Sequence, residues 1–146
     1  MDYSTIQNAE SKEVVQALEQ LIEPLLVPGE TVVIGVPATW RERAEPASVG
    51  TFQGAIIGTT LSVIFLYKEV KRQSFDDLDK IIAFPKDSVL RAQRVRTVLT
   101  STMGRKFYAP KPNSHHVEIT QIDGGVFSFY LLQQHQSDLL KYLEQK

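Results

Sequence analysis

The chain has 146 residues, of which 42% are hydrophobic, and a formal net charge of −1 at pH 7. This length and composition predict one domain, residues 1–146, with enough apolar side chain to bury a core. The chain has no cysteine, which excludes a disulfide framework, a thiolate nucleophile and cysteine-based zinc or iron–sulfur sites. No apolar run approaches the roughly 20 residues of a membrane-spanning helix, and no signal-peptide pattern opens the chain, so we expect a cytoplasmic protein.

An amphipathic helix is predicted first, within residues 1–24. Its apolar residues recur at helical spacing: Val14, Val15, Leu18, Leu21 and Ile22. Ser4 and Gln7 are placed for a capping box at the start, and Pro24 ends the pattern. The polar positions carry four glutamates: Glu10, Glu13, Glu19 and Glu23. A face of this kind is usually solvated, and the alternative is that it contacts a partner.

Sheet is predicted for most of the chain that follows. Residues 30–36 form the first predicted strand, which we expect to stop near Pro37 because proline lacks the N–H that a strand ladder needs. Two apolar, β-branched runs within residues 54–67, separated by small residues around Gly58, predict a pair of antiparallel strands. Shorter strands are predicted at 70–75 and 81–84.

Residues 88–103 fit two kinds of structure. Apolar residues recur there at helical spacing: Ala92, Val95, Val98, Leu99 and Met103. Residues 97–102, however, are rich in the β-branched side chains that strands prefer. We interpret the segment as a helix, which Asp87 or Ser88 can cap and Gly104 can end.

A hairpin and a helix are predicted at the end of the chain. Polar and apolar residues alternate from Val117 onward, Asp123 and Gly124 mark a turn, and residues 126–132 return. Residues 136–146 then predict a helix with an apolar stripe that needs cover, which the opening of a bent sheet would supply.

This succession of elements resembles the pleckstrin-homology (PH) superfold, specifically the bacterial PH-like domains. Residues 26–30, Leu-Val-Pro-Gly-Glu, are similar to the opening of the first strand in those families, and residues 54–67 to their second and third strands. Residues 73–81 resemble the segment in which an acidic pair follows the fourth strand. The resemblance covers residues 26–146 and implies an α+β fold. We therefore expect a bent antiparallel sheet or partly open β-barrel, with a capping helix at its C-terminal end and an added N-terminal helix.

Positive charge gathers between residues 86 and 116, which hold seven Lys and Arg and a single acid, Asp87. The cations that we single out as candidate ligand- or partner-binding residues are Arg91, Arg94, Arg96, Arg105 and Lys106. On a helix, Arg91 and Arg94 share a face while Arg96 points elsewhere, so only part of the charge converges. Converging cations would bind a polyanion, either an acidic lipid surface or a nucleic acid, and this binding would weaken with salt.

Trp40 and Arg41 follow the first predicted strand and complete the candidate binding residues. An exposed indole can anchor a partner, and the alternative is that Trp40 packs as a cap on the barrel end. The PH-like domains that bind phosphoinositides use a basic first loop, whereas the matching loop here, residues 41–45, has two acids and two bases. The resemblance therefore does not imply inositol-phosphate binding.

Residues 115–118, His-His-Val-Glu, include types that bind zinc. On a strand His116 and Glu118 share one face while His115 points to the other, so at most two of these groups converge. The chain also lacks the Gly-x-Ser-x-Gly elbow and the glycine-rich phosphate loop. A small enzyme built around these residues is thus the least supported hypothesis, and we predict no catalytic residue, metal or cofactor.

The sequence leads to the hypothesis of a non-catalytic binding module. Its expected partner is a protein or an anionic membrane surface, and self-association through an open strand edge is a further option. The alternative hypothesis is a nucleic-acid-binding accessory protein that uses the basic segment 86–111, with Phe107 and Tyr108 stacking on bases. The near-neutral charge disfavours this alternative, because nonspecific duplex binders are basic overall.

Overall fold

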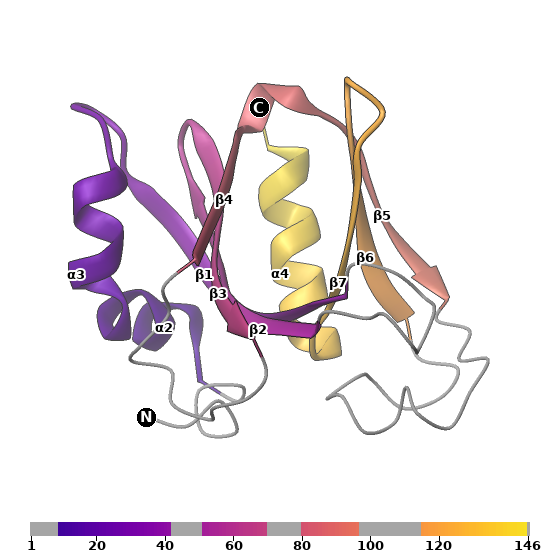
Figure 1. Cartoon of the computed structure of the whole chain (residues 1–146), viewed down its shortest axis with the longest axis horizontal. Coiled ribbons are helices and arrows are strands. Elements are labelled where there is room, and N and C mark those ends of the chain that lie inside the picture. The colour runs from indigo at the N-terminus through magenta and orange to yellow at the C-terminus, as the bar shows by residue number, and fades with distance from the viewer. Residues whose placement is uncertain (1–8, 42–50, 70–79, 97–114, 146) are drawn as a thin grey trace.

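The computed structural model of the chain describes residues 9–41, 51–69, 80–96 and 115–145 (Figure 1). Seven antiparallel strands form one sheet in the order β4-β3-β2-β1-β7-β6-β5. The strands are β1 (Val32–Arg41), β2 (Thr51–Thr59), β3 (Ser62–Glu69), β4 (Lys80–Pro85), β5 (Val89–Arg96), β6 (His115–Gln121) and β7 (Val126–Tyr130). The helical elements are α2 (Ser11–Ala17), α3 (Glu19–Ile22), η1 (Glu23–Leu25), η3 (Lys86–Ser88) and α4 (Gln133–Glu144). In these ranges no helix has both the length and the apolar character needed to cross a membrane.

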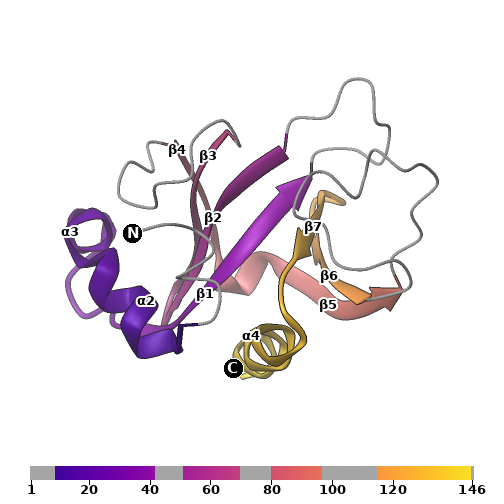
Figure 2. The same cartoon turned by 90° about the horizontal axis from the view of Figure 1, so that it is seen from below.

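The sheet is strongly bent, because β4 and β5 lie at its opposite edges and yet only η3 separates them in sequence. The N–H of Lys86 donates to the carbonyl oxygen of Leu61 at 2.8 Å, and the N–H of Ile122 donates to that of Ser88 at 2.8 Å. The strands β1–β4 thus lie on one side of α4 and β5–β7 on the other (Figure 1 and Figure 2). The predicted α+β fold with an antiparallel sheet and a C-terminal helix is confirmed, and the open, bent sheet fits a partly open barrel.

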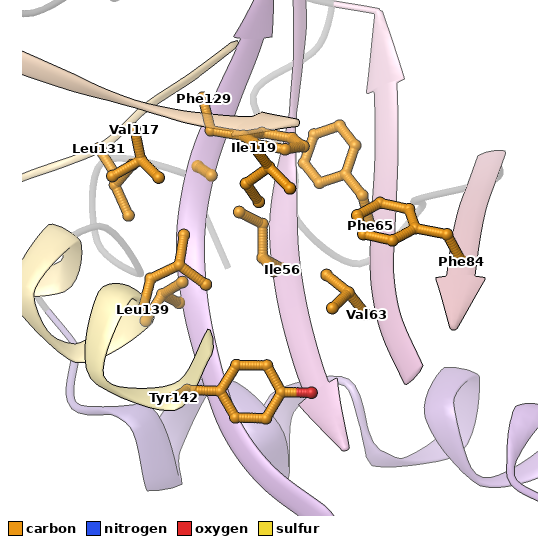
Figure 3. Close-up of a cluster of buried hydrophobic side chains, with 12 residues drawn as sticks. Ile56, Val63, Phe65, Phe84, Val117, Ile119, Phe129, Leu131, Leu139 and Tyr142 are labelled. Carbon is orange, nitrogen blue, oxygen red and sulfur yellow. The ribbon is translucent and has the colours of Figure 1, made fainter. Parts of the chain in front are cut away.

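The neighbouring strands β2 and β3 carry apolar side chains on both faces, because both faces are covered. Inward-facing Ile56, Val63 and Phe65 join a core that includes Leu139 and Tyr142 of α4 (Figure 3). The outward-facing side chains of these strands pack against α2 and α3: Ala55, Ile57, Ile64 and Leu66. Two-sided burial explains why this part of the sequence is a nearly continuous apolar run rather than an alternating one.

The predicted N-terminal helix is present as α2 and α3, which lie against the outward face of the sheet (Figure 1). Val14, Leu18 and Ile22 are each at most 2% exposed and supply its contacts with β2 and β3. The helix is interrupted at Leu18, whose φ is −110°, and α3 ends at Ile22, where the 3-10 turn η1 that contains Pro24 begins. The predicted capping box at residues 4–7 lies outside the described residues.

The expectation that the first strand stops near Pro37 is wrong, because β1 continues to Arg41. Pairing of β1 with β7 begins only at Thr39, so among the described strands β2 alone pairs with β1 at Pro37. The N–H of Gly35 points away from β2 and donates to Ser11 Oγ at 2.8 Å. Residues two apart on a strand direct their backbone groups to the same side, so the N–H that Pro37 lacks would face this unpaired edge.

The helix predicted for residues 88–103 is also wrong in the part that the structure describes, because Val89–Arg96 is the edge strand β5. A register shift near its start interrupts the alternation that would have identified it. The inward-facing positions after this shift hold the small Ala92 and the charged Arg94 instead of large apolar residues. Residues 97–103 lie outside the described ranges.

The remaining predicted elements are found with small shifts. β4 contains the predicted strand 81–84, and β6 and β7 form the predicted hairpin, with Gly124 at a φ of +91° in its turn. The strand predicted at 70–75 lies outside the described residues. α4 begins at Gln133, earlier than predicted, and Ser137 lies within it and donates to the carbonyl oxygen of Gln133 at 3.3 Å.

Tyr142 holds α4 to the sheet. Its ring, 1% exposed, extends from α4 toward β2 (Figure 3), where a β-carbon added to Gly58 would lie 2.6 Å from the ring carbons. Its hydroxyl lies 2.5 Å from the carbonyl oxygen of Thr59 and 3.0 Å from that of Ser62, and it donates its proton to this β2–β3 turn. Burial raises the pKa of Tyr142 to about 12, so the hydroxyl keeps that proton at neutral pH. Lys86 Nζ lies 4.3 Å from the ring centroid, which also connects η3 to this contact.

Glu30, 8% exposed, is hydrogen-bonded to the same turn. Its carboxylate accepts hydrogen bonds from the Thr59 hydroxyl and, at 3.0 Å, from the N–H of Val27. The Thr59 hydroxyl oxygen accepts in turn from the N–H groups of Leu61 at 3.1 Å and Ser62 at 2.8 Å. The hydrogen bonds that the Glu30 carboxylate accepts, above all the one from Thr59, lower its pKa below the ordinary value of 4.5. Burial acts in the opposite direction and raises that pKa.

Replacing Gly58 by alanine would place a methyl group against the ring of Tyr142. We expect Gly58→Ala to lower the free energy of unfolding by about 1–3 kcal/mol, the usual cost of overpacking a core. In a Tyr142→Leu background the same change should cost far less, and chemical denaturation of the four chains measures this coupling. The matched control is Gly125→Ala, whose methyl group would lie 3.1 Å from its nearest neighbours, both flexible side-chain oxygens. Equal losses of unfolding free energy in Gly58→Ala and Gly125→Ala would contradict the contact between Gly58 and the Tyr142 ring.

A second prediction concerns acid stability. The folded chain favours the ionised form of Glu30 more than the unfolded chain does, so this group stabilises the fold above pH 4.5 and loses that effect as the pH falls. We expect Glu30→Gln to be less stable at neutral pH and to lose less stability between about pH 5 and pH 3. Thermal unfolding across this range, with exposed Glu13→Gln as the control, measures the difference. If the thermal stability of wild type and of Glu30→Gln falls equally with pH, the stabilising role of the ionised Glu30 is refuted.

Candidate binding surfaces

Two cations of the predicted basic site lie apart in the structure. Arg91 and Arg94 are exposed on the edge strand β5, and since side chains alternate along a strand they lie on opposite faces. The prediction that these two arginines share a face is therefore wrong. Arg94 lies near α4, where its Nη2 donates to Ser137 Oγ at 3.0 Å. Arg96 ends β5, and the two further predicted cations lie outside the described residues: Arg105 and Lys106.

Exposed apolar side chains and Arg91 lie at the end of the sheet where η3 lies. Leu90 is 66% exposed, Ile122 67% and Val126 52%. Arg91 and Val126 both pair with Thr120, one from each side, so they share the outward face of β5–β7. The exposed acids at this end are Asp87 and Asp123. This face combines large exposed apolar groups with charges of both signs.

Trp40 packs against three other aromatic rings. Its ring centroid lies 6.3 Å from that of Phe65, 5.7 Å from that of Tyr67 and 5.8 Å from that of Phe127. The half-buried indole thus belongs to the margin of the core, which agrees with the packing alternative. Arg41 is the last residue of β1. A role for these two residues in binding stays a prediction.

His116 and Glu118 share the outward face of β6, with His116 Nε2 3.9 Å from Glu118 Oε2. His115 is exposed, and alternation places it on the other face. The His116 ring packs on that of Tyr130, with centroids 4.9 Å apart, and burial lowers the pKa of His116 below its usual 6.5. Within the described ranges no three His, Cys, Asp or Glu side chains form a group that could hold a metal ion. Packing against the Tyr130 ring explains the position of the His116 side chain.

A surface groove runs along one side of α2 and α3 where they meet the start of β1, and we call it the α2–α3 groove. It consists of two adjoining hollows, of about 410 Å³ beside α2 and about 370 Å³ beside α3. Both hollows are lined by Val15, Gln16 and Val32. The first also contacts Ser11, Lys12 and Val33, and the second Glu19, Ile22, Glu23 and Leu26.

The α2–α3 groove is apolar along its floor and negatively charged at its rim. Val33 is 46% exposed although it lies on a strand, and Val15 and Val32 are half-buried beside it. Glu19 and Glu23 line the hollow beside α3, and Lys12 lines the hollow beside α2. Glu10 and Glu13 are exposed nearby in the sequence and line neither hollow. The groove therefore offers apolar contacts within a negative potential.

Sequence reasoning identified the acidic helix but not the groove. The apolar stripe of this helix is wider than its contact with the sheet requires, because Val14, Leu18 and Ile22 alone are fully buried. Val15, half-buried, and Leu21, 37% exposed, lie at the margins of the stripe. This excess width of the apolar stripe is the sequence feature that could have indicated a groove beside the helix. The contribution of β1 to the groove follows only from the tertiary structure.

No protein-family model matches this sequence, and neither does any curated protein. Solved structures resemble the fold. The hSac2 domain of the human phosphoinositide phosphatase Sac2 matches 91% of this chain and 80% of its own, with a TM-score of 0.59 and 9% sequence identity. The C-terminal domain of an unknown protein from Leishmania infantum matches 92% of this chain and 97% of its own, with a TM-score of 0.48 and 13% identity. At such identity the likeness to the human domain is one of fold.

Proposed function

We propose that this protein is a non-catalytic binding module with a PH-like fold, and that it recognises a protein partner through the α2–α3 groove. The observation that carries the proposal is the pair of adjoining hollows, because partner side chains bury best in concave apolar surfaces. Two strand meanders, β1–β4 and β5–β7, joined along β1 and β7 and followed by a helix, support the PH-like assignment. Leu139 and Tyr142 of α4 occupy the concave side of the sheet, which favours recognition on the outside.

A peptide-display library without charge bias tests this proposal on the full chain. We expect enriched peptides whose affinity falls at least about tenfold in Val33→Arg, which places a long cationic side chain in the hollow beside α2. Val126→Arg is the matched control, because this valine is similarly exposed on a strand that does not line either hollow. Thermal unfolding verifies that both variants fold. If no peptide is enriched, or if both variants bind the selected peptides equally, the proposal fails.

Contact with an anionic membrane is a second candidate, favoured by the joint exposure of Leu90, Arg91 and Val126. Such a contact combines apolar insertion with attraction of cations to acidic lipids. The nucleic-acid alternative has less support, because it requires cations that converge and the arginines at positions 91 and 94 diverge.

Co-sedimentation with neutral and anionic phospholipid vesicles, at low and physiological salt, tests the membrane candidate. If the outward face of β5–β7 binds anionic vesicles, Arg91→Glu should abolish salt-sensitive binding. Arg94→Glu, which changes the same charge on the opposite face of the same strand, should retain it. Equal loss in both variants, or binding to neither kind of vesicle, would exclude this surface.

A further inference from the structure

We infer that the partner segment in the α2–α3 groove is a cationic amphipathic helix, an inference that rests on the proposed function. Charge is the first reason. Glu19 and Glu23 line the hollow beside α3, and among the described residues Lys12 is the one cation that lines either hollow. A partner with cations along its sides would place them beside these two carboxylates, whereas an acidic partner would be repelled.

The spacing of the hollows is the second reason. Lys12 of α2 lines one hollow and Glu19 of α3 lines the other, and the two hollows adjoin at Val15, Gln16 and Val32. On a helix, side chains at positions i and i+7 lie on one face about two turns, or roughly 10 Å, apart. A helix that lies along the groove therefore reaches both hollows with apolar side chains at positions i and i+7. A third apolar side chain at i+3 or i+4 would lie over Val15 and Val32, which the two hollows share.

The edge of β1 favours a helix over an added strand. Strand addition needs a row of free N–H and C=O groups along the receiving strand. The N–H of Gly35 is already bonded to Ser11 Oγ, and Pro37 has no N–H to offer. β1 instead contributes the side chains of Val32 and Val33 to the groove, and side-chain contacts are what a docked helix uses.

Three synthetic peptides test the inference against the full chain. All carry leucine at i, i+4 and i+7 on one helical face, and the flanking positions are all lysine, all glutamine or all glutamate. Fluorescence anisotropy at about 50 mM and 500 mM salt measures their dissociation constants. We expect the lysine peptide to bind on the order of tenfold more tightly than the glutamate peptide at low salt, and the difference to shrink at high salt. A lysine peptide with its last leucine moved from i+7 to i+5 should lose affinity, because that side chain no longer shares the face.

Charge reversal of the groove supplies the matching protein variants. The double change Glu19→Lys and Glu23→Lys should invert the order of the three peptides. Asp138→Lys with Glu144→Lys makes the same change in net charge on the exposed side of α4 and should leave the order intact. Val33→Arg should weaken every peptide that binds in the groove.

The inference is overturned if the glutamine or glutamate peptide binds as tightly as the lysine peptide, if the Glu19 and Glu23 reversal leaves the order unchanged, or if no peptide binds. The proposed function is judged separately, by whether library-selected peptides of any charge or conformation depend on Val33. Selected peptides that need Val33 but are extended or acidic would thus refute the cationic helix and leave the protein-binding groove in place.

Discussion

The shortness of the connection between β4 and β5 determines the shape of this molecule. Three residues, Lys86–Ser88, join strands that lie at opposite edges of a seven-stranded sheet, so the sheet must bend until those edges meet. Backbone hydrogen bonds to Leu61 and Ile122 attach this corner to the hairpin turns on either side. Such bending leaves a concave face with apolar side chains, and α4 covers it with Leu139 and Tyr142.

Filling the concave face has a consequence for recognition. The core packs α4 against the inward face of the sheet, while α2 and α3 cover the outward face of β2 and β3. These two helices are short and interrupted at Leu18, and they leave the start of β1 partly uncovered, with Val33 46% exposed. The α2–α3 groove thus lies where the cover of the sheet is incomplete, and it is lined by Glu19 of α3 and Glu23 of η1. Its acidic residues come from the helical segment, whereas its apolar floor combines side chains of that segment with Val32 and Val33 of β1.

The sequence patterns that depend on burial alone predicted the fold well. The apolar run at 54–67, the hairpin around Gly124 and the stripe of the C-terminal helix identified their elements because the core imposes those periods. β5 was missed because an edge strand buries few side chains and a register shift breaks its period. Glu30 was identified only as part of a family-like opening, and its hydrogen bond to Thr59, 29 residues away, has no local signal. The groove combines α2, α3 and β1, so no single stretch of sequence predicts it.

The contact between Tyr142 and Gly58 is the most direct test of this account, since it distinguishes a filled concave face from an open one. Nuclear Overhauser spectroscopy of the full chain in solution detects that contact. We expect strong cross-peaks between the Tyr142 ring protons and the Gly58 α-protons, with one α-proton shifted upfield by the ring current. Absence of these cross-peaks, together with α4 leucine methyl groups that show none to Ile56, would contradict the account and make the concave face itself the candidate binding site.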